Sequence, residues 1–255
     1  NFANAALPSV LTKDNPVLFT GTGTISLNSR LTAYGGFVQG LEEALIAPDI
    51  ATNRSEAPPA IRTRQMDLGL RYALTPKMSF VAGVFSVQKP YFNLDPALRY
   101  RQLGQVDNRG VEVSLAGGIR PGLSIVAGAL LLDPKISGEA VDAGLIGMRP
   151  VGVVRTRGIA NLDWRFKDGT SPWSVDIAFE ALSSRVANAS NTLYAPPRQN
   201  INLGMRYRFK LDDHPVLFRA QAQNLFNDYG WQVSSSGGFT YSNGRTYMAQ
   251  VIVDL

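Results

Sequence analysis

Residues of the types that most often carry chemistry are sparse in this chain of 255 residues. It has one histidine, His214, and no cysteine. His214 lies in the segment DDHP behind Asp212 and Asp213, and no serine or cysteine nucleophile is arranged around it. We interpret it as a solvated turn histidine, with metal ligation by these three residues as the alternative. The sequence therefore predicts no catalytic residue, no resident metal and no cofactor.

Two further segments match chemical motifs only in part. The segment GTGTIS at 21–26 resembles a phosphate-binding loop, but it lacks the third glycine and lies between predicted strands. The adjacent acids Glu42 and Glu43 begin a predicted long loop, where solvated carboxylates are expected. Neither segment indicates nucleotide binding or catalysis.

Charge and composition exclude other classes of protein. The net charge is +5 and the pI about 9.6, but the cations are scattered singly, so nucleic-acid binding is not predicted. The chain is 45% hydrophobic with a mean hydropathy of −0.04 and has no run of 18 apolar residues, which excludes a helical membrane protein. No signal peptide is visible, and the chain begins without Met, so we expect a mature form or a fragment.

The remaining polar and aromatic side chains must be positioned by β-strands. Eleven segments alternate between apolar and polar residues with a period of two, which predicts strands with one apolar and one polar face. In 201–211 three cations alternate with the apolar residues, which is unusual for a soluble core and typical of a channel wall. The predicted strands are 17–25, 30–41, 62–72, 77–88, 109–118, 122–132, 153–166, 173–183, 199–211, 215–226 and 244–255.

The connections between these strands alternate strictly in length. Short, turn-like segments rich in Pro, Gly, Asp and Asn occupy 26–29, 74–77, 119–122, 167–172 and 212–215. Long segments occupy 42–61, 89–108, 133–152, 184–198 and 227–243. An up-and-down antiparallel sheet places all short turns at one end, as in bacterial outer-membrane barrels, whereas a Greek-key sandwich has no reason to sort its loops.

Aromatic residues add an independent indication. Eight of them lie on the predicted apolar faces, each within a few residues of a short turn, where a barrel would carry its periplasmic aromatic girdle. They are Tyr72, Phe80, Trp164, Phe166, Trp173, Tyr207, Phe209 and Phe218.

Several segments together resemble the C-terminal part of a TonB-dependent outer-membrane receptor, most similar to the ferric-siderophore branch. The resemblance covers nearly the whole chain. It rests on residues 31–72, FSVQKPYFNLD (85–95), NRGVEVSLAG (108–117), MRPVGV (148–153), QNLFNDYGW (223–231) and the closing strand. It implies that residues 1–255 are an all-β, antiparallel up-and-down meander of about 10–11 strands, the C-terminal half of a 22-stranded transmembrane β-barrel.

The resemblance also implies a function and partners. The function is uptake of ferric siderophores across the outer membrane of a Gram-negative bacterium, energised through TonB. The implied partners are the lipid bilayer, lipopolysaccharide, a ferric siderophore and the barrel-assembly machinery. The resemblance also implies an N-terminal plug, which this sequence does not include, and TonB, which would bind through that same N-terminal region. The barrel-assembly machinery would recognise the terminal-strand residues Tyr247, Val251, Val253 and Leu255, although such barrels usually end in Phe or Trp.

A bulky, often anionic ferric chelate would be bound by aromatic and guanidinium groups of the long loops. The candidates are Tyr91, Phe92, Arg99, Tyr100, Arg101, Arg149, Tyr194, Arg198, Tyr229, Trp231, Phe239 and Tyr241. Three alternatives remain open at this point: TonB-dependent uptake of cobalamin or an oligosaccharide, a passive porin, and a soluble β-sandwich binding module.

Overall fold

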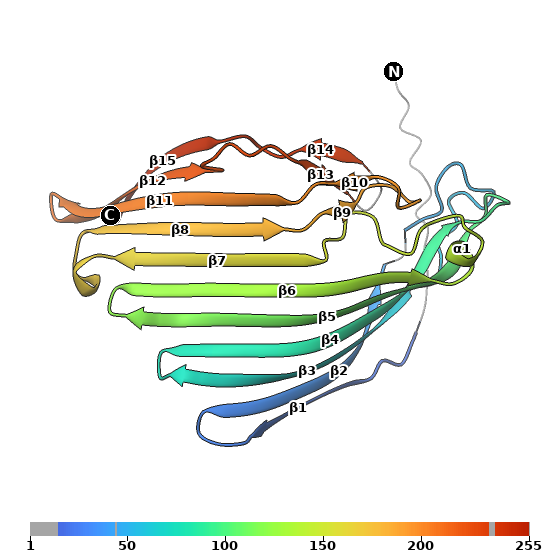
Figure 1. Ribbon diagram of the computed structural model, residues 1–255, viewed down its shortest axis with the longest axis horizontal. Helices are drawn as coiled ribbons and strands as arrows, with labels where there is room; N and C mark the ends of the chain where they lie inside the picture. Colours follow the sequence, from blue (N-terminus) through green and yellow to red (C-terminus); the bar gives the residue numbers. More distant parts are fainter. Residues whose placement is uncertain (1–14, 44, 235–237, 255) are drawn as a thin grey trace.

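The computed structural model describes residues 15–43, 45–234 and 238–254. Its main feature is one antiparallel sheet of eleven strands in which every strand pairs with the next one in the sheet (Figure 1). The strands are β1 (Thr20–Ser26), β2 (Leu31–Glu42), β3 (Ile61–Thr75), β4 (Met78–Leu94), β5 (Tyr100–Arg120), β6 (Leu123–Ser137), β7 (Thr156–Arg165), β8 (Trp173–Leu182), β11 (Arg198–Leu211), β12 (His214–Gln223) and β15 (Thr246–Val253).

Smaller elements lie in the connections at one end of this sheet. Two short hairpins, β9–β10 and β13–β14, and the helix α1 all belong to connections that were predicted to be long (Figure 1). Their bounds are β9 (Arg185–Val186), β10 (Tyr194–Ala195), β13 (Trp231–Val233), β14 (Phe239–Tyr241) and α1 (Glu139–Asp142), and a 3-10 turn, η1 (Lys167–Gly169), lies at the other end. In the part of the chain described, no helix is long and apolar enough to span a membrane.

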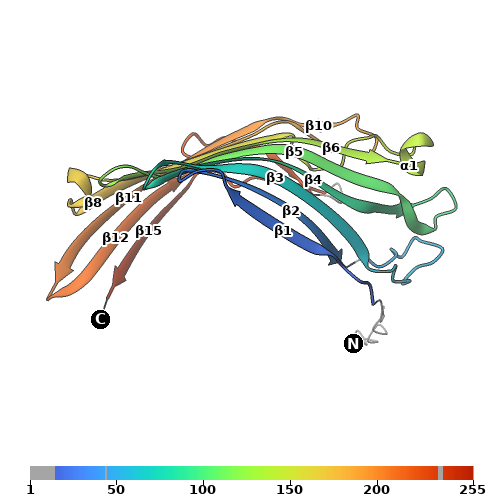
Figure 2. The ribbon, with the colours of Figure 1, turned by 90° about the horizontal axis from the view of Figure 1, so that it is seen from below.

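The sheet curves into an arch whose edges are β1 and β15 (Figure 2). All eleven predicted strands are present and in the predicted order, so the antiparallel meander is confirmed. The described residues form no second sheet that packs face to face against the first, as a β-sandwich would require.

Tight turns form the short connections, as predicted. The clearest is the link between β11 and β12, where Asp212 and Asp213 have φ angles of 49° and 68°. Two consecutive residues with positive φ are typical of a type I′ hairpin turn, whose twist matches that of the flanking strands. His214 follows as the exposed first residue of β12 and pairs with Leu211 across the hairpin.

The strand register keeps the two faces of the sheet separate from end to end. Since directly paired residues share a face, rows can be followed across the sheet. One such row joins Ile177, Leu203 and Ala222, and a neighbouring row on the opposite face joins Asp176 and Gly204. The same alternation continues through all eleven strands, so the apolar residues of each strand line up into one apolar face.

Burial indicates which of the two faces is concave. Side chains converge on the inside of an arch and diverge on its outside. Ser174, on the polar face, is 1% exposed, whereas Met66 and Leu68 on the apolar face are 57% and 62% exposed. The polar face therefore lines the inside of the arch, and the apolar face covers its outside.

Two predictions of the connections are wrong in detail. Residues 89–108 are not a long loop, because β4 and β5 continue as a tall hairpin with pairs as far as Leu94 and Tyr100. The apolar alternation ends lower down, since a strand that rises beyond an apolar layer no longer needs an apolar face. The predicted strand 153–166 begins only at Thr156, because residues 149–155 bulge away from β6.

Candidate ligand-binding site at the loop end

The hairpin of β4 and β5 carries five of the candidate residues at its tip. Tyr91 packs against an apolar cluster that includes Leu103 and Ile136, and its hydroxyl oxygen accepts a hydrogen bond from Asn93 Nδ2 at 2.8 Å. The rings of Phe92 and Tyr100 lie 6.0 Å apart. Arg99 is exposed in the turn. Tyr91 therefore helps to hold the hairpin on its neighbours.

Arg101, the fifth, is engaged in an ion-pair clasp. Its Nε donates to Asp95 Oδ2 at 2.8 Å, and its Nη1 and Nη2 donate to the two carboxylate oxygens of Glu139 at 2.9 and 2.6 Å. Hydrogen bonds from Arg101 are the main reason that the pKa values of the Asp95 and Glu139 carboxyls lie below their usual range. The clasp joins the tip of the β4–β5 hairpin to α1 and leaves little of this guanidinium for a ligand.

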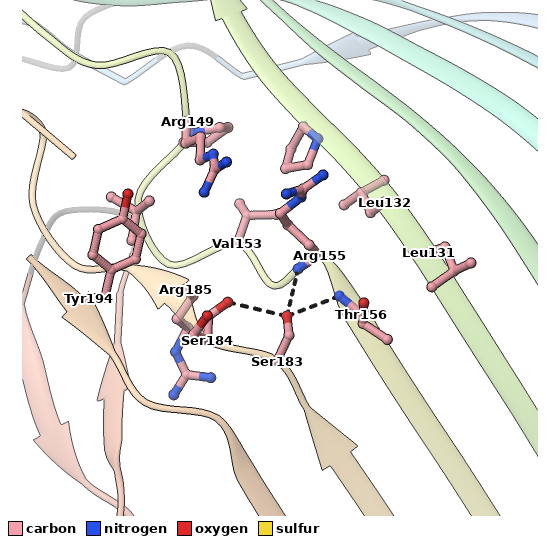
Figure 3. Close-up of a pocket in the computed structure, with 13 residues that line it drawn as sticks. Leu131, Leu132, Arg149, Val153, Arg155, Thr156, Ser183, Ser184, Arg185 and Tyr194 are labelled. Atoms are coloured by element: carbon pink, nitrogen blue, oxygen red, sulfur yellow. Dashed lines mark hydrogen bonds between the residues drawn. The ribbon is translucent and has the colours of Figure 1, made fainter. Parts of the chain in front are cut away.

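A cavity of about 440 Å³ opens where residues 149–155 leave β6. The bulge is bounded by hydrogen bonds from Ile136 N to Met148 O and from Leu132 N to Arg155 O, both 2.7 Å. Figure 3 shows that the strand ends, the bulge and the β9–β10 hairpin surround it. Its lining is Leu131, Leu132, Pro134, Arg149, Pro150, Val153, Arg155, Thr156, Ser183, Ser184, Arg185, Val186 and Tyr194.

Arg149 and Tyr194, two of the candidates, are brought together in this cavity although 45 positions separate them in the sequence. Hydrogen bonds from the backbone N–H groups of Arg155 and Thr156 to Ser183 Oγ, at 3.1 and 3.0 Å, hold its floor (Figure 3). The cavity therefore presents arginine side chains on a framework built from β6 and two separate connections, β6–β7 and β8–β11.

The β13–β14 hairpin gathers three more candidates into an aromatic platform. Trp231 stacks on Tyr241 at 4.0 Å between ring centroids and meets Phe239 edge-on at 6.0 Å. All three rings are exposed, as is Tyr229 next to them in the sequence. The platform is joined to the cavity because Arg185 Nη2 donates a hydrogen bond to the carbonyl oxygen of Trp231.

Arg198, the last candidate, lies beside the same hairpin. A Cβ at Gly230 would be 3.2 Å from its Cδ, so the arginine stem runs along the chain just before Trp231. The structure thus divides the twelve candidates into two groups: those at the tip of β4–β5, and those around the cavity and the platform. Their contact with a ligand stays a prediction.

Arg155 and Arg185 line the cavity but were not among the candidates. Arg155 lies in a segment whose apolar and polar residues alternate as in a strand. It lines the cavity only because residues 149–155 bulge away from β6. Arg185 follows two serines in a predicted loop, and nothing in its neighbours distinguishes it from a solvated arginine.

The predicted aromatic girdle lies at the opposite end of the sheet, beside the short turns. Tyr72 pairs with Phe80 across β3 and β4. The rings of Trp173 and Tyr207 are 4.3 Å apart, and Phe209 stacks 5.5 Å from Tyr207. Phe218 continues this row, paired with Tyr207. These contacts form an aromatic row on the outside of the arch that is interrupted at β5 and β6, where Leu115 and Ala127 follow Phe80 in the register. The place of this row in a membrane interface stays a prediction.

The aromatic pair on β7 extends the row with one difference from the prediction. Trp164 lies on the strand, with the Arg120 guanidinium 5.5 Å from its ring centroid, a cation–π distance. Phe166 lies one residue beyond the end of β7, but its ring packs edge-on against Trp164 at 4.7 Å. The turn therefore keeps Phe166 beside the apolar face.

The terminal-strand candidates occupy β15. Tyr247, Val251 and Val253 are exposed on its apolar face, paired with Ala222, Phe218 and Val216 of β12. Leu255 lies outside the described residues. Recognition of this strand by assembly machinery stays a prediction.

On the inside of the arch, a charged network connects four strands. Asp163 of β7 and Asp176 of β8 are direct register partners, and Arg206 of β11 forms ion pairs with both. Arg219 of β12 approaches Asp176 to 4.0 Å. A Cβ at position 204 would collide with the Asp176 carboxylate, so the glycine there lets the carboxylate lie across β11. Of the three cations of 201–211, Arg206 therefore neutralises acids of the wall itself, and Arg208 donates a hydrogen bond to Ser174 Oγ at 3.0 Å.

Comparison with known proteins assigns the architecture. Residues 12–225 match the family model described as TonB dependent receptor-like, beta-barrel. The chain belongs to this family. Members are receptors of the Gram-negative outer membrane, so the chain is part of an outer-membrane β-barrel.

Individual receptors resemble the chain over most of its length. The ferrichrome receptor FcuA of Yersinia enterocolitica is 26% identical over 221 residues, which are 83% of this chain and 28% of the relative. The ferric preacinetobactin receptor BauA of Acinetobacter baumannii is 28% identical, with a TM-score of 0.79 over 93% of this chain and 36% of that structure. The ferric yersiniabactin uptake receptor FyuA of Yersinia pestis shares the fold at 18% identity and a TM-score of 0.71, over 94% of this chain and 36% of that structure. The chain thus spans about a third of the length of these receptors.

Proposed function

We propose that this chain is the C-terminal half of a 22-stranded barrel that imports a ferric siderophore across the outer membrane. Two similar receptors, for ferrichrome and for ferric preacinetobactin, support an iron chelate as the solute. The observation that carries the proposal is the joining of the Trp231 platform to the arginine-lined cavity at the loop end of a receptor barrel. Aromatic faces and guanidinium donors suit a large chelate with an anionic periphery.

In this proposal the arch closes with further strands at β1 and β15, since an unpaired edge is not tolerated in lipid. An N-terminal plug would pack against the polar inner face, and TonB would supply energy from the inner membrane. Lipid and lipopolysaccharide would contact the outer face, and the barrel-assembly machinery would bind β15. The role is transport, with no catalytic step.

The test is uptake by cells that carry the full-length protein as their only candidate receptor. Under iron limitation, ⁵⁵Fe delivered on at least one of a panel of ferric siderophores should accumulate, and accumulation should stop when TonB is deleted. Uptake that persists without TonB would indicate a passive porin instead. Uptake of labelled cobalamin or an oligosaccharide, with no chelate accepted, would assign a different solute to the same barrel.

A further inference from the structure

Arg185 is buried at the base of the loop-end cavity with almost none of its hydrogen-bonding capacity used. The residue is 7% exposed. Its Nη2 donates to the Trp231 carbonyl oxygen, while its Nε is buried and has no partner among the described residues. A guanidinium has five N–H donors, and leaving buried donors unpaired is costly. The side chain is therefore held in place by one hydrogen bond, and its Nε donor is unpaired among the described residues.

The charge of Arg185 is also uncompensated. Burial, and then the like charge of Arg198, lower the pKa of this guanidinium, but arginine remains protonated in proteins. Among the described residues, neither Arg185 nor Arg198 takes part in an ion pair. Buried charges in folded proteins are normally paired, because an isolated buried ion is strongly destabilising. An anion is the missing partner.

The rest of the cavity has the same sign of charge. Arg149 and Arg155 also line it, and its lining contains no Asp or Glu. In Figure 3 the Arg149 and Arg155 side chains lie toward the top of the view, and the Arg185 side chain extends below Ser184, so the three cations are spread over the lining. Asp133, which is not part of the lining, is 3.7 Å from Arg155 and is also paired with Lys135. Cations spread over a cavity of this size suit a ligand with several anionic oxygens.

We propose that the Arg149–Arg155–Arg185 cavity is an anion subsite for the transported chelate, which makes the receptor selective for ferric chelates with net negative charge. This inference rests on the proposed function. Three hydroxamates carry one negative charge each and neutralise Fe³⁺, so a ferric tris-hydroxamate is neutral. Three catecholates carry two negative charges each, so a ferric tris-catecholate carries three. The subsite would favour catecholate or carboxylate chelates over neutral hydroxamates, with the Trp231 platform next to it.

The test is binding to the purified full-length receptor, measured by quenching of tryptophan fluorescence. The probes are hexadentate ferric tris-catecholates, ferric carboxylate chelates and ferric tris-hydroxamates. The wild type should bind at least one anionic chelate ten-fold or more tightly than any neutral one. R185M should weaken that binding at least ten-fold and R149M about three-fold, with binding of neutral chelates unchanged. R54M, at an exposed arginine away from the cavity, is the matched control.

Other outcomes would overturn the subsite. These are preference for a neutral chelate, equal loss for both charge classes in R185M, or weakened folding of R185M that R185K restores while R149M binds like wild type. The last result would show that an acid elsewhere in the full-length protein pairs with Arg185. If no ferric chelate binds the wild type at all, the proposed function fails with it, whereas binding without charge preference removes only the subsite.

Discussion

Replacing Arg206 by Met would leave Asp163 and Asp176 facing each other on the inner wall of the barrel. The two carboxylates are register partners on β7 and β8, and Arg206 is the only cation paired with both in the part of the chain described. The Arg206 side chain is 19% exposed, so solvent would compensate its loss only in part. The substitution removes one charge and exposes a repulsion between two others.

The size of the effect follows from the geometry. Directly paired residues on adjacent strands of one sheet have Cβ atoms about 5 Å apart. Two unit charges at that separation repel by about 3 kcal/mol at an effective dielectric constant of about 20. Solvent around Asp163, which is 46% exposed, and the remaining cation Arg219 would reduce this. We expect R206M to lower the free energy of unfolding by about 2 kcal/mol.

The assay is urea unfolding of the full-length receptor in lipid vesicles, followed by tryptophan fluorescence and by gel mobility. The matched control is R64M, at an exposed arginine of β3 outside the ion pairs of the described residues, which should change the free energy by less than about 0.5 kcal/mol. Adding D163N to R206M should recover at least half of the loss, because it removes one of the facing charges. If R206M is no less stable than R64M, or if D163N lowers stability further, the network is not electrostatically coupled.

Three further outcomes are expected. Gly69→Ala should destabilise the barrel by about 1–3 kcal/mol, because its Cβ would collide with the Tyr34 ring and lie 2.7 Å from the Ala82 carbonyl oxygen, whereas Gly21→Ala, with open space around it, should be neutral in the same unfolding assay. The hydrogen-exchange protection factors of α1, which are corrected for the intrinsic pH dependence of exchange, should be high above about pH 5 and fall below about pH 4, since carboxylates with lowered pKa stabilise the clasp only while ionised; in R101M the protection should be low at both values, and an unchanged profile would contradict the clasp. The two tryptophans of the aromatic row, each kept as the only tryptophan, should be quenched by bromine near the lipid headgroup more than by bromine at the bilayer centre, and the reverse order would place the row elsewhere.

Local alternation made most of the fold predictable. In a strand, successive side chains point to opposite faces, so an apolar face such as that of Met66 and Leu68 is visible in the sequence. Turns are equally local, since Asp212 and Asp213 tolerate positive φ and mark the hairpin themselves. Eleven strands, their order and the end with short turns follow from these signals. The upper half of the β4–β5 hairpin could not be predicted from these signals, because its strands pair without an apolar face.

The candidate site was predictable in residue type but not in arrangement. Aromatic and arginine residues stand out in the loop segments, and Arg149, Tyr194 and Trp231 were found in this way. Arg185 was not, because its burial depends on the carbonyl of Trp231, 46 positions away. The sequence by itself determined the strands, their faces and their turns, since the backbone pleat imposes those patterns over a few residues. Only the tertiary structure decided which distant loops meet, where the arginine-lined cavity opens and which wall charges neutralise each other, because those contacts join residues that have no local relation along the chain.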